Sequence, residues 1–205
     1  MTAESEDEIN RRHAEKMAKR KEVRARMLAE KTGEKGLLIV HTGKGKGKST
    51  AAFGLVLRAL GHGKRVGIVQ FVKGRWASGE RNVLERFGDQ VTLKVVGEGF
   101  TWETQDRARD MAMARVGIEA ARAMIAEPTL DLVVLDELNI VLRYDYLPLD
   151  EVRALLAGRR AGLHIVITGR NAKPELIEDA DLVTEMVELK HPFRAGIRAQ
   201  IGIEF

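Results

Sequence analysis

One short stretch of the sequence, residues 37–60, constrains the fold more than any other part of the chain. An apolar run over 37–41 leads directly into Thr-Gly-Lys-Gly-Lys-Gly-Lys-Ser-Thr at 42–50. Residues 48–60 then have the composition of a helix, and the glycines at 61 and 63 end it. A strand, a glycine-rich loop and a helix in this order predict an α/β domain, with the loop at the carboxyl end of a strand.

The loop at 42–50 has the chemistry of a phosphate site. Its three glycines let the main chain approach an anion closely, and the helix that follows turns free N–H groups and the positive end of its dipole toward the loop. Lys48 adds a full positive charge, and Ser49 offers a hydroxyl to a divalent cation. The sequence therefore predicts a nucleotide site of the P-loop kind. The expected ATP contacts in the loop are Thr42, Gly43, Lys44, Gly45, Lys46, Gly47, Lys48, Ser49 and Thr50.

The spacing of this loop departs from the usual Walker pattern. Gly-x-x-x-x-Gly-Lys-[Ser/Thr] requires a glycine at position 42, where this chain has a threonine. Counted from Gly43, the loop is one residue short. A loop shifted in this way can hold a triphosphate differently, so ordinary transfer of the γ-phosphoryl group does not follow automatically from the motif.

After the loop, apolar runs alternate with helical patterns. Further strands are expected at 65–72, 91–96, 130–135, 163–168 and 182–189. Helices are expected at 78–87, 104–127, 149–156 and 174–180. The alternation predicts an α/β fold of the P-loop NTPase kind: a doubly wound, mainly parallel sheet of about six strands with helices on both faces. Ligands of such sheets bind beyond the carboxyl ends of the strands.

Residues 1–35 are expected to form a charged helical extension that precedes the domain at 36–205. The segment 8–31 is rich in Glu, Lys, Arg, Ala and Met, which favour helix, but its apolar positions are sparse. Two interpretations remain open: a solvated appendage, or a lid or partner arm that needs another surface to pack on.

Composition excludes several classes of protein. The chain has no cysteine, which excludes a disulfide scaffold, a zinc ribbon, an iron–sulfur cluster and a cysteine nucleophile. The net charge of +4 is spread evenly, since residues 1–35 carry ten Lys or Arg against eight Asp or Glu, so no basic arm indicates nucleic acid. No apolar stretch predicts a membrane span or a signal peptide, and a cytoplasmic location is expected.

The expected strand at 130–135 leads into Asp136 and Glu137. These carboxylates should face the phosphate loop and can hold Mg²⁺ (or Mn²⁺) together with Ser49. Which of the two carboxylates binds the metal directly stays open. The alternative interpretation is that Asp136 only caps the helix that follows.

In combination, these residues resemble the P-loop ATP:corrinoid adenosyltransferases, of the cob(I)yrinic acid a,c-diamide or cob(I)alamin type. The resemblance covers residues 36–205. Besides the loop, it rests on Gln-Phe-Val-Lys-Gly at 70–74, Gly-Glu-Gly-Phe-Thr-Trp at 97–102, Val-Leu-Asp-Glu-Leu at 134–138, Thr-Gly-Arg at 168–170 and Gly-Ile-Glu-Phe at 202–205.

The resemblance implies transfer of the 5′-deoxyadenosyl group of ATP to the cobalt(I) of a corrinoid, with release of triphosphate, in cobalamin biosynthesis. It also implies that ATP lies across the loop in the reversed sense, with its 5′ carbon toward the corrinoid. The substrate's cobalt is then the nucleophile, so the protein is needed mainly for positioning and electrostatics. The absence of nucleophile and zinc-protease motifs from the sequence agrees with this chemistry.

The resemblance assigns catalytic roles to Phe100 and Trp102. These aromatics would press on the lower face of the corrinoid and keep cobalt free of a lower axial ligand; the alternative is that both are core residues. Arg170 is expected to contact the phosphates of ATP or the amide rim of the corrinoid, and Lys73 and Arg75 can do the same. The five histidines are interpreted as structural or surface residues.

The expected partners are ATP, a corrinoid, an external flavin or flavoprotein reductant, and a second copy of the chain in a homodimer. Neither nucleic acid nor a membrane is expected. Two other functions stay open: a P-loop ATPase or kinase that cleaves the γ-phosphate, and a nucleotide-binding regulatory module. Product analysis distinguishes these functions from the adenosyltransferase, because only the adenosyltransferase yields triphosphate together with an adenosylated corrinoid.

Overall fold

The computed structural model describes residues 5–72, 79–96 and 106–204 of the chain. It divides the chain into two compact units, Met1–Glu34 and Lys35–Phe205.

The first unit contains one helix, α1 (Glu6–Ala29). Ser5 and Glu8 begin it with a reciprocal capping box: the Ser5 hydroxyl accepts from the Glu8 N–H, and the Glu8 carboxylate accepts from the Ser5 N–H. None of the described residues of α1 is buried. The expected exposed helix is therefore confirmed, whereas its role as appendage or lid stays a prediction.

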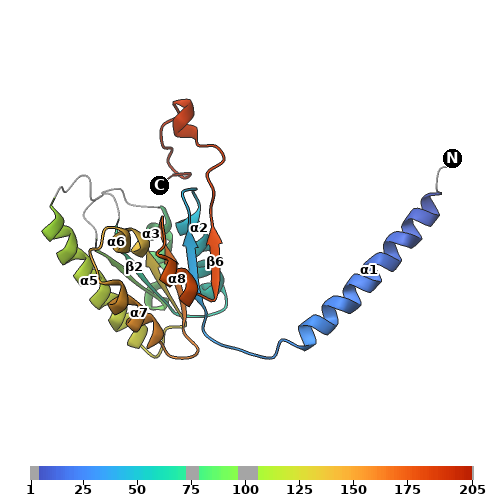
Figure 1. The fold of residues 1–205 in the computed structure, drawn as a ribbon, viewed down its shortest axis with the longest axis horizontal. Helices are drawn as coiled ribbons and strands as arrows, with labels where there is room; N and C mark the ends of the chain where they lie inside the picture. The colour runs from blue at the N-terminus through green and yellow to red at the C-terminus, as the bar shows by residue number, and fades with distance from the viewer. Residues whose placement is uncertain (1–4, 73–78, 97–105, 205) are drawn as a thin grey trace. The chain divides into compact units, whose positions relative to one another are not determined.

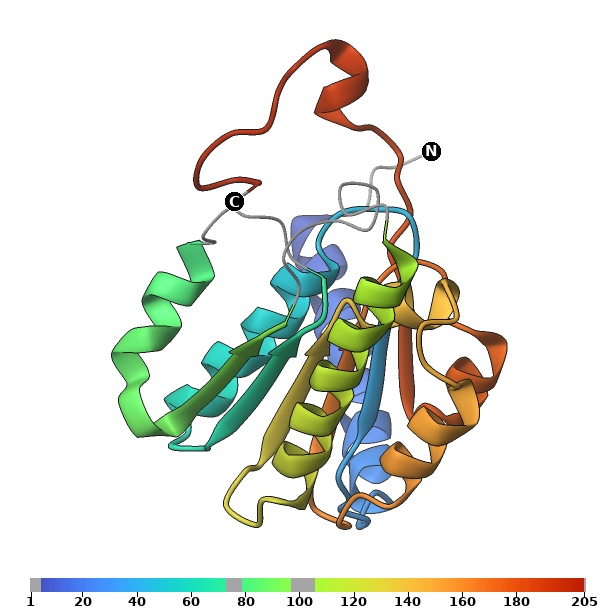
Figure 2. The same ribbon diagram turned by 90° about the vertical axis from the view of Figure 1, so that its left-hand side faces the viewer.

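The second unit is built on a six-stranded sheet with the order β3-β2-β4-β5-β1-β6 (Figures 1 and 2). Its strands are β1 (Leu38–Thr42), β2 (Val66–Gln70), β3 (Val91–Val95), β4 (Leu132–Asp136), β5 (His164–Thr168) and β6 (Leu182–Glu185). Every neighbouring pair is parallel. The predicted parallel α/β sheet is confirmed, and all carboxyl ends consequently meet at one edge.

Helices follow the strands as the alternation predicted. They are α2 (Lys48–Gly61), α3 (Gly79–Leu84), α5 (Arg107–Ala126), α6 (Leu138–Arg143), α7 (Leu149–Ala157) and α8 (Pro174–Asp179), with 3-10 turns η1 (Glu85–Gln90) and η2 (Pro192–Ala195). Helix α6 was not expected, because six residues are too few to show a helical period. The helix expected at 78–87 gives way to η1 after Leu84.

The core lies in two layers, one on each face of the sheet. Along β4, Val133 and Leu135 pack on the face covered by α5, α6 and α7, while Leu132 and Val134 pack on the face covered by α2. Both sets are buried because a parallel strand with helices on either side has no solvent-facing surface. The uniformly apolar run that the sequence shows at this strand is thus explained.

Strand β6 is shorter than expected, since it ends at Glu185 rather than at 189. Beyond Glu185 its hydrogen bonds go first to Thr42, the last residue of β1, and then to the glycine-rich loop. The Met186 N–H donates to the Thr42 carbonyl at 2.9 Å, and the Gly45 N–H donates to the Met186 carbonyl at 2.7 Å. The chain then leaves the sheet as the C-terminal segment (residues 186–204), which rises above the carboxyl edge (Figure 2).

Among the helices in the described part of the chain, none is both long and apolar enough to cross a membrane.

Candidate nucleotide-binding site

The conformation of the glycine-rich loop is stabilised by contacts with two other parts of the chain, at Met186 and at Ala172. Gly43 and Gly47 have φ of +95° and +103°, a left-handed conformation that favours glycine. A Cβ on Gly45 would come within 2.8 Å of the Met186 carbonyl oxygen, so a larger residue cannot lie against the C-terminal segment here. Thr42 contributes its hydroxyl, which accepts from the Ala172 N–H at 3.0 Å. The side chain of Thr42 thus supports the loop from within the fold.

Helix α2 begins directly after the loop, with Gly47 as its N-cap. No side chain in the described residues caps this end. The first-turn N–H groups of a helix have no intrahelical partner, so they and the helix dipole are available to an anion. Ser49 and Thr50 lie in that first turn and line the cavity beside the loop.

Lys48 is almost fully buried, with 6% of its surface exposed. Its Nζ donates a hydrogen bond to the Gly45 carbonyl at 2.5 Å. Burial lowers the pKa of this ammonium group; the Glu137 carboxylate opposes the effect, while Arg170 adds to it. A lysine in this position supplies concentrated positive charge to the loop, and phosphate is the anion that such an arrangement suits.

Asp136 ends β4 and is 4% exposed. Its Oδ2 accepts from Gln70 Nε2 at 3.0 Å, and its Oδ1 accepts from the Thr168 hydroxyl at 2.7 Å. Asp136 therefore does not cap the next helix, and that alternative interpretation is wrong. The N-cap of α6 is Glu137, which makes no side-chain capping bond.

Glu137 has φ of 63°, a left-handed conformation unusual for a residue with a side chain. Burial, followed by the charge of Asp136, raises the pKa of its carboxyl to about 7, although Lys48 and Arg170 act in the opposite direction. Glu137 thus lies within electrostatic reach of Lys48 and Arg170. Its main-chain N–H donates to the Thr168 hydroxyl at 2.9 Å.

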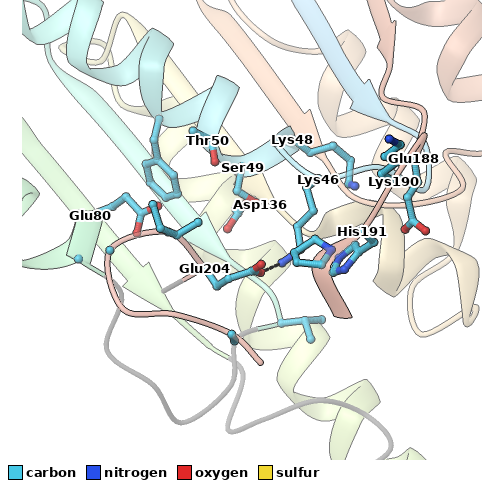
Figure 3. A pocket seen from close by; sticks show the side chains of 18 of the residues that line it. Lys46, Lys48, Ser49, Thr50, Glu80, Asp136, Glu188, Lys190, His191 and Glu204 are labelled. Carbon is cyan, nitrogen blue, oxygen red and sulfur yellow. Dashed lines mark hydrogen bonds and ion pairs between the residues drawn. The ribbon is translucent and has the colours of Figure 1, made fainter. Parts of the chain in front are cut away.

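A cavity of about 1480 Å³ opens beside the loop (Figure 3). The structure brings these predicted site residues together on its wall: Lys46, Gly47, Lys48, Ser49, Thr50 and Asp136. The other predicted residues that the structure describes are not on that wall: Thr42, Gly43, Lys44, Gly45, Glu137 and Arg170. The cavity exceeds the roughly 300–1,000 Å³ typical of one small ligand, so it has room for more than a nucleotide.

Two parts of the chain form the rest of the cavity wall. One part is apolar and comes from helices α2 and α3, through Phe53, Leu57, Val83 and Leu84. The opposite part comes from the C-terminal segment. The cavity therefore joins a cationic end at the loop to an apolar surface along α2.

The C-terminal segment returns to the loop. Glu204 forms an ion pair with Lys46, and His191 lies beside it in the cavity (Figure 3). The hydrogen bond from Lys46 lowers the pKa of the Glu204 carboxyl, and His191 contributes in the same direction. Sequence reasoning used Gly-Ile-Glu-Phe at 202–205 only for resemblance and assigned no site role to Glu204 or His191. The motif at 202–205 was the sequence feature from which a site role for Glu204 could have been predicted.

Four predicted residues, Phe100, Trp102, Lys73 and Arg75, lie outside the described residues. The structure describes β3 and the residue after it, Val96, which is buried.

Ser49 and Asp136 fit a hard divalent cation. A hydroxyl and a carboxylate are oxygen donors, and Mg²⁺ is usually bound through one or two carboxylates with waters and substrate phosphates completing its shell. In the described ranges, no three or more His, Cys, Asp or Glu side chains gather into a metal site. The donor set therefore suits a cation that arrives with a nucleotide.

A parallel sheet with a glycine-rich loop after β1, a lysine at the following helix and an aspartate at the end of β4 defines a P-loop nucleotide-binding protein. The family model described as ATP:corrinoid adenosyltransferase BtuR/CobO/CobP matches residues 34–205. A second model, Cob(I)alamin adenosyltransferase N terminal, matches residues 2–28. The chain belongs to the ATP:corrinoid adenosyltransferase family, as the sequence resemblance predicted.

Curated relatives agree with this assignment. The chain is 56% identical over 196 residues to a corrinoid adenosyltransferase of Sinorhizobium sp, covering 95% of this chain and 92% of that protein. It is 52% identical over 198 residues to one of Pseudomonas aeruginosa, covering 97% and 98%. It is 49% identical over 178 residues to corrinoid adenosyltransferase CobA of Salmonella typhimurium, covering 87% and 90%.

Proposed function

We propose that the cavity beside the loop is where ATP gives up its adenosyl group to a corrinoid. The activity itself is that of the family: the chain is an enzyme of the cobalamin pathway that transfers the adenosyl group from ATP to a corrinoid. The observation that carries the proposal is the family match over 34–205 together with a cavity lined by Lys46, Lys48, Ser49 and Asp136.

The reaction requires one bond to form and one to break. The electron pair of cobalt(I) attacks the 5′ carbon of ATP and forms the cobalt–carbon bond, so that cobalt becomes formally cobalt(III). The carbon–oxygen bond breaks, and its electron pair leaves with the triphosphate. Negative charge therefore accumulates on the triphosphate. We assign its stabilisation to Lys46, Lys48 and the first turn of α2, which line the cavity beside the loop.

A magnesium ion, or manganese, would be held by Ser49 and Asp136 and would neutralise part of the triphosphate charge. Asp136 suits this role better than Glu137, because Asp136 is on the cavity wall and Glu137 is not. Glu137 instead faces the charges of Lys48 and Arg170. We assign Glu137 to the support of the loop lysine, since its carboxylate favours the charged ammonium group, and Arg170 to the phosphates of ATP.

Phe100 and Trp102 are proposed to cover the lower face of the corrinoid, on the strength of the motif at 97–102. The proposed reductant is an external flavin or flavoprotein, because a chain without cysteine has no thiol of its own with which to reduce cobalt. The proposed location is the cytoplasm.

A homodimer is proposed as the working assembly. Exposed apolar side chains of the C-terminal segment that do not line the cavity support it, namely Phe193, Ile197 and Ile201. Large apolar side chains that gather on an exposed surface usually mark an interaction site. Light scattering on the purified protein tests the assembly, and a stable monomer at micromolar concentration would contradict it.

One product analysis tests the function. ATP and a chemically reduced corrinoid should yield an adenosylated corrinoid and inorganic triphosphate in equal amounts. ADP and phosphate in place of these products would instead identify the chain as an ATPase or kinase. ATP binding without turnover would indicate a regulatory module.

A further inference from the structure

Three motifs that lie far apart in the sequence meet at Asp136. Gln70 ends β2, Asp136 ends β4 and Thr168 ends β5, and β4 lies between the other two strands. Gln70 is the register partner of Asp136. The carboxylate is consequently flanked by a polar side chain from each neighbouring strand, at the edge where the cavity opens.

Each carboxylate oxygen has its own donor. Gln70 Nε2 donates to Oδ2 at 3.0 Å, and the Thr168 hydroxyl donates to Oδ1 at 2.7 Å. The direction of the second bond is determined by a third group: the Glu137 N–H donates to the Thr168 oxygen at 2.9 Å. Because a hydroxyl has a single proton, that proton is left for Asp136.

Both partners are themselves buried, with Gln70 2% and Thr168 0% exposed. Neither side chain can therefore turn away from Asp136 without leaving a buried polar group unpaired, which is unfavourable. The two bonds fix the carboxylate plane, and they leave its remaining lone pairs for the cavity that Asp136 lines with Ser49.

The charge of Asp136 is not neutralised by this pair of donors. Within the described residues, no lysine, arginine or histidine forms an ion pair with Asp136. A buried carboxylate whose only hydrogen-bond donors are neutral is stabilised further by a cation, because burying an unpaired charge is unfavourable. A divalent cation bound with ATP would supply it.

We propose that Gln70 and Thr168 are positioning residues that hold the Asp136 carboxylate in the orientation required by a nucleotide-bound divalent cation. The inference rests on the proposed role of Asp136 in the ATP site. It gives a function to the glutamine of the 70–74 motif and the threonine of the 168–170 motif, neither of which lines the cavity.

The test measures ATP binding by calorimetry without corrinoid, so that no turnover occurs. The quantity of interest is the metal gain, defined as the ratio of the ATP dissociation constant in EDTA to that in excess Mg²⁺. Thr168→Val and Gln70→Met remove the donors but keep side-chain volume. Each should reduce the metal gain by about 10- to 100-fold, the usual effect of losing a hydrogen-bond partner of a metal ligand, while the affinity in EDTA stays within twofold.

Three further variants make the result specific. Thr168→Ser keeps the hydroxyl and should restore the metal gain to within about threefold of the wild type. Thr92→Val makes the same change on the exposed side of edge strand β3 and should have no effect. Asp136→Asn should abolish the metal gain, which measures the role of the carboxylate itself.

The outcomes distinguish the positioning role of Gln70 and Thr168 from the metal role of Asp136. If Asp136→Asn loses the metal gain but Thr168→Val and Gln70→Met keep it, the positioning role is wrong and the proposed ATP site stands. If the wild type shows no metal gain, or Asp136→Asn keeps it, the metal role of Asp136 and the positioning role fail together. Thermal unfolding identifies a variant that does not fold. If either Thr168→Val or Gln70→Met does not fold, the metal gain of the other variant tests the positioning role.

Discussion

The Lys48 ammonium group donates a hydrogen bond to the Gly45 carbonyl at 2.5 Å, across the phosphate loop. This hydrogen bond links the first turn of α2 to the middle of the loop. A phosphate has stronger acceptors than a peptide carbonyl, so we expect the ammonium group to exchange partners when ATP binds. Burial lowers the pKa of this ammonium group, and the Glu137 carboxylate acts in the opposite direction.

Replacing Lys48 with alanine should weaken ATP binding by about 10- to 100-fold, since one charge-assisted hydrogen bond contributes roughly 1.5–3 kcal/mol. Calorimetry in EDTA measures the effect without interference from metal. Lys64→Ala is the matched control, because Lys64 pairs with Asp131 at 3.0 Å on the surface, away from the cavity wall. Unchanged ATP affinity in a folded Lys48→Ala protein would exclude the loop as the phosphate site.

Replacing Glu204 with glutamine should strengthen the binding of inorganic triphosphate. The Glu204 carboxylate is an internal anion on Lys46, and the incoming triphosphate must compete with it. An exposed ion pair contributes about 0.2–1 kcal/mol, so a two- to fivefold lower dissociation constant is expected. Glu151→Gln, which removes the ion pair between Glu151 of α7 and Arg115 of α5, should leave the triphosphate dissociation constant unchanged. Weaker binding in Glu204→Gln would show that the carboxylate assists the ligand instead.

Stability should fall with acid because of His41. Burial lowers the pKa of this imidazole below its ordinary 6.5, so the folded protein keeps it neutral while the unfolded chain takes up a proton. The free energy of unfolding therefore decreases as pH falls through about 6.5, by at most about 1.4 kcal/mol per pH unit from this group. His41→Leu should flatten the curve between pH 7 and pH 5 in urea unfolding. His62→Leu, at an exposed position, should leave it unaltered.

Phe100→Ala and Trp102→Ala should slow the reaction that starts from cobalt(II) and a reduced flavin. An axial donor raises the orbital that must accept the electron, and bulky apolar side chains exclude that donor. Both variants should react at nearly the wild-type rate when cobalt(I) is supplied chemically. Electron paramagnetic resonance should find four-coordinate cobalt(II) in the wild type and less in the variants; a full signal in both would remove these aromatics from the site.

The predicted elements agree with the structure where the signal is local. The loop, α2 and the apolar strand ending at Asp136 are each recognisable within about ten consecutive residues, because periodicity and glycine placement act over that distance. Helix α6 escaped prediction because it is short and begins at Glu137 in a left-handed conformation. The end of β6 was placed too far along, because its true neighbour, Gly45, belongs to the loop and not to a strand.

By itself, the sequence determined the class of fold, the identity of the phosphate loop and the family. These depend on residue types at fixed short spacings, which a chain carries before it folds. The strand order was decided only in the tertiary structure, and with it the placement of Gln70 and Thr168 on either side of Asp136. These contacts join residues 66 and 32 positions apart, and the Lys46–Glu204 pair joins residues 158 apart. Parallel strands are ordered by the packing of both faces against helices, and that packing is a property of the whole domain.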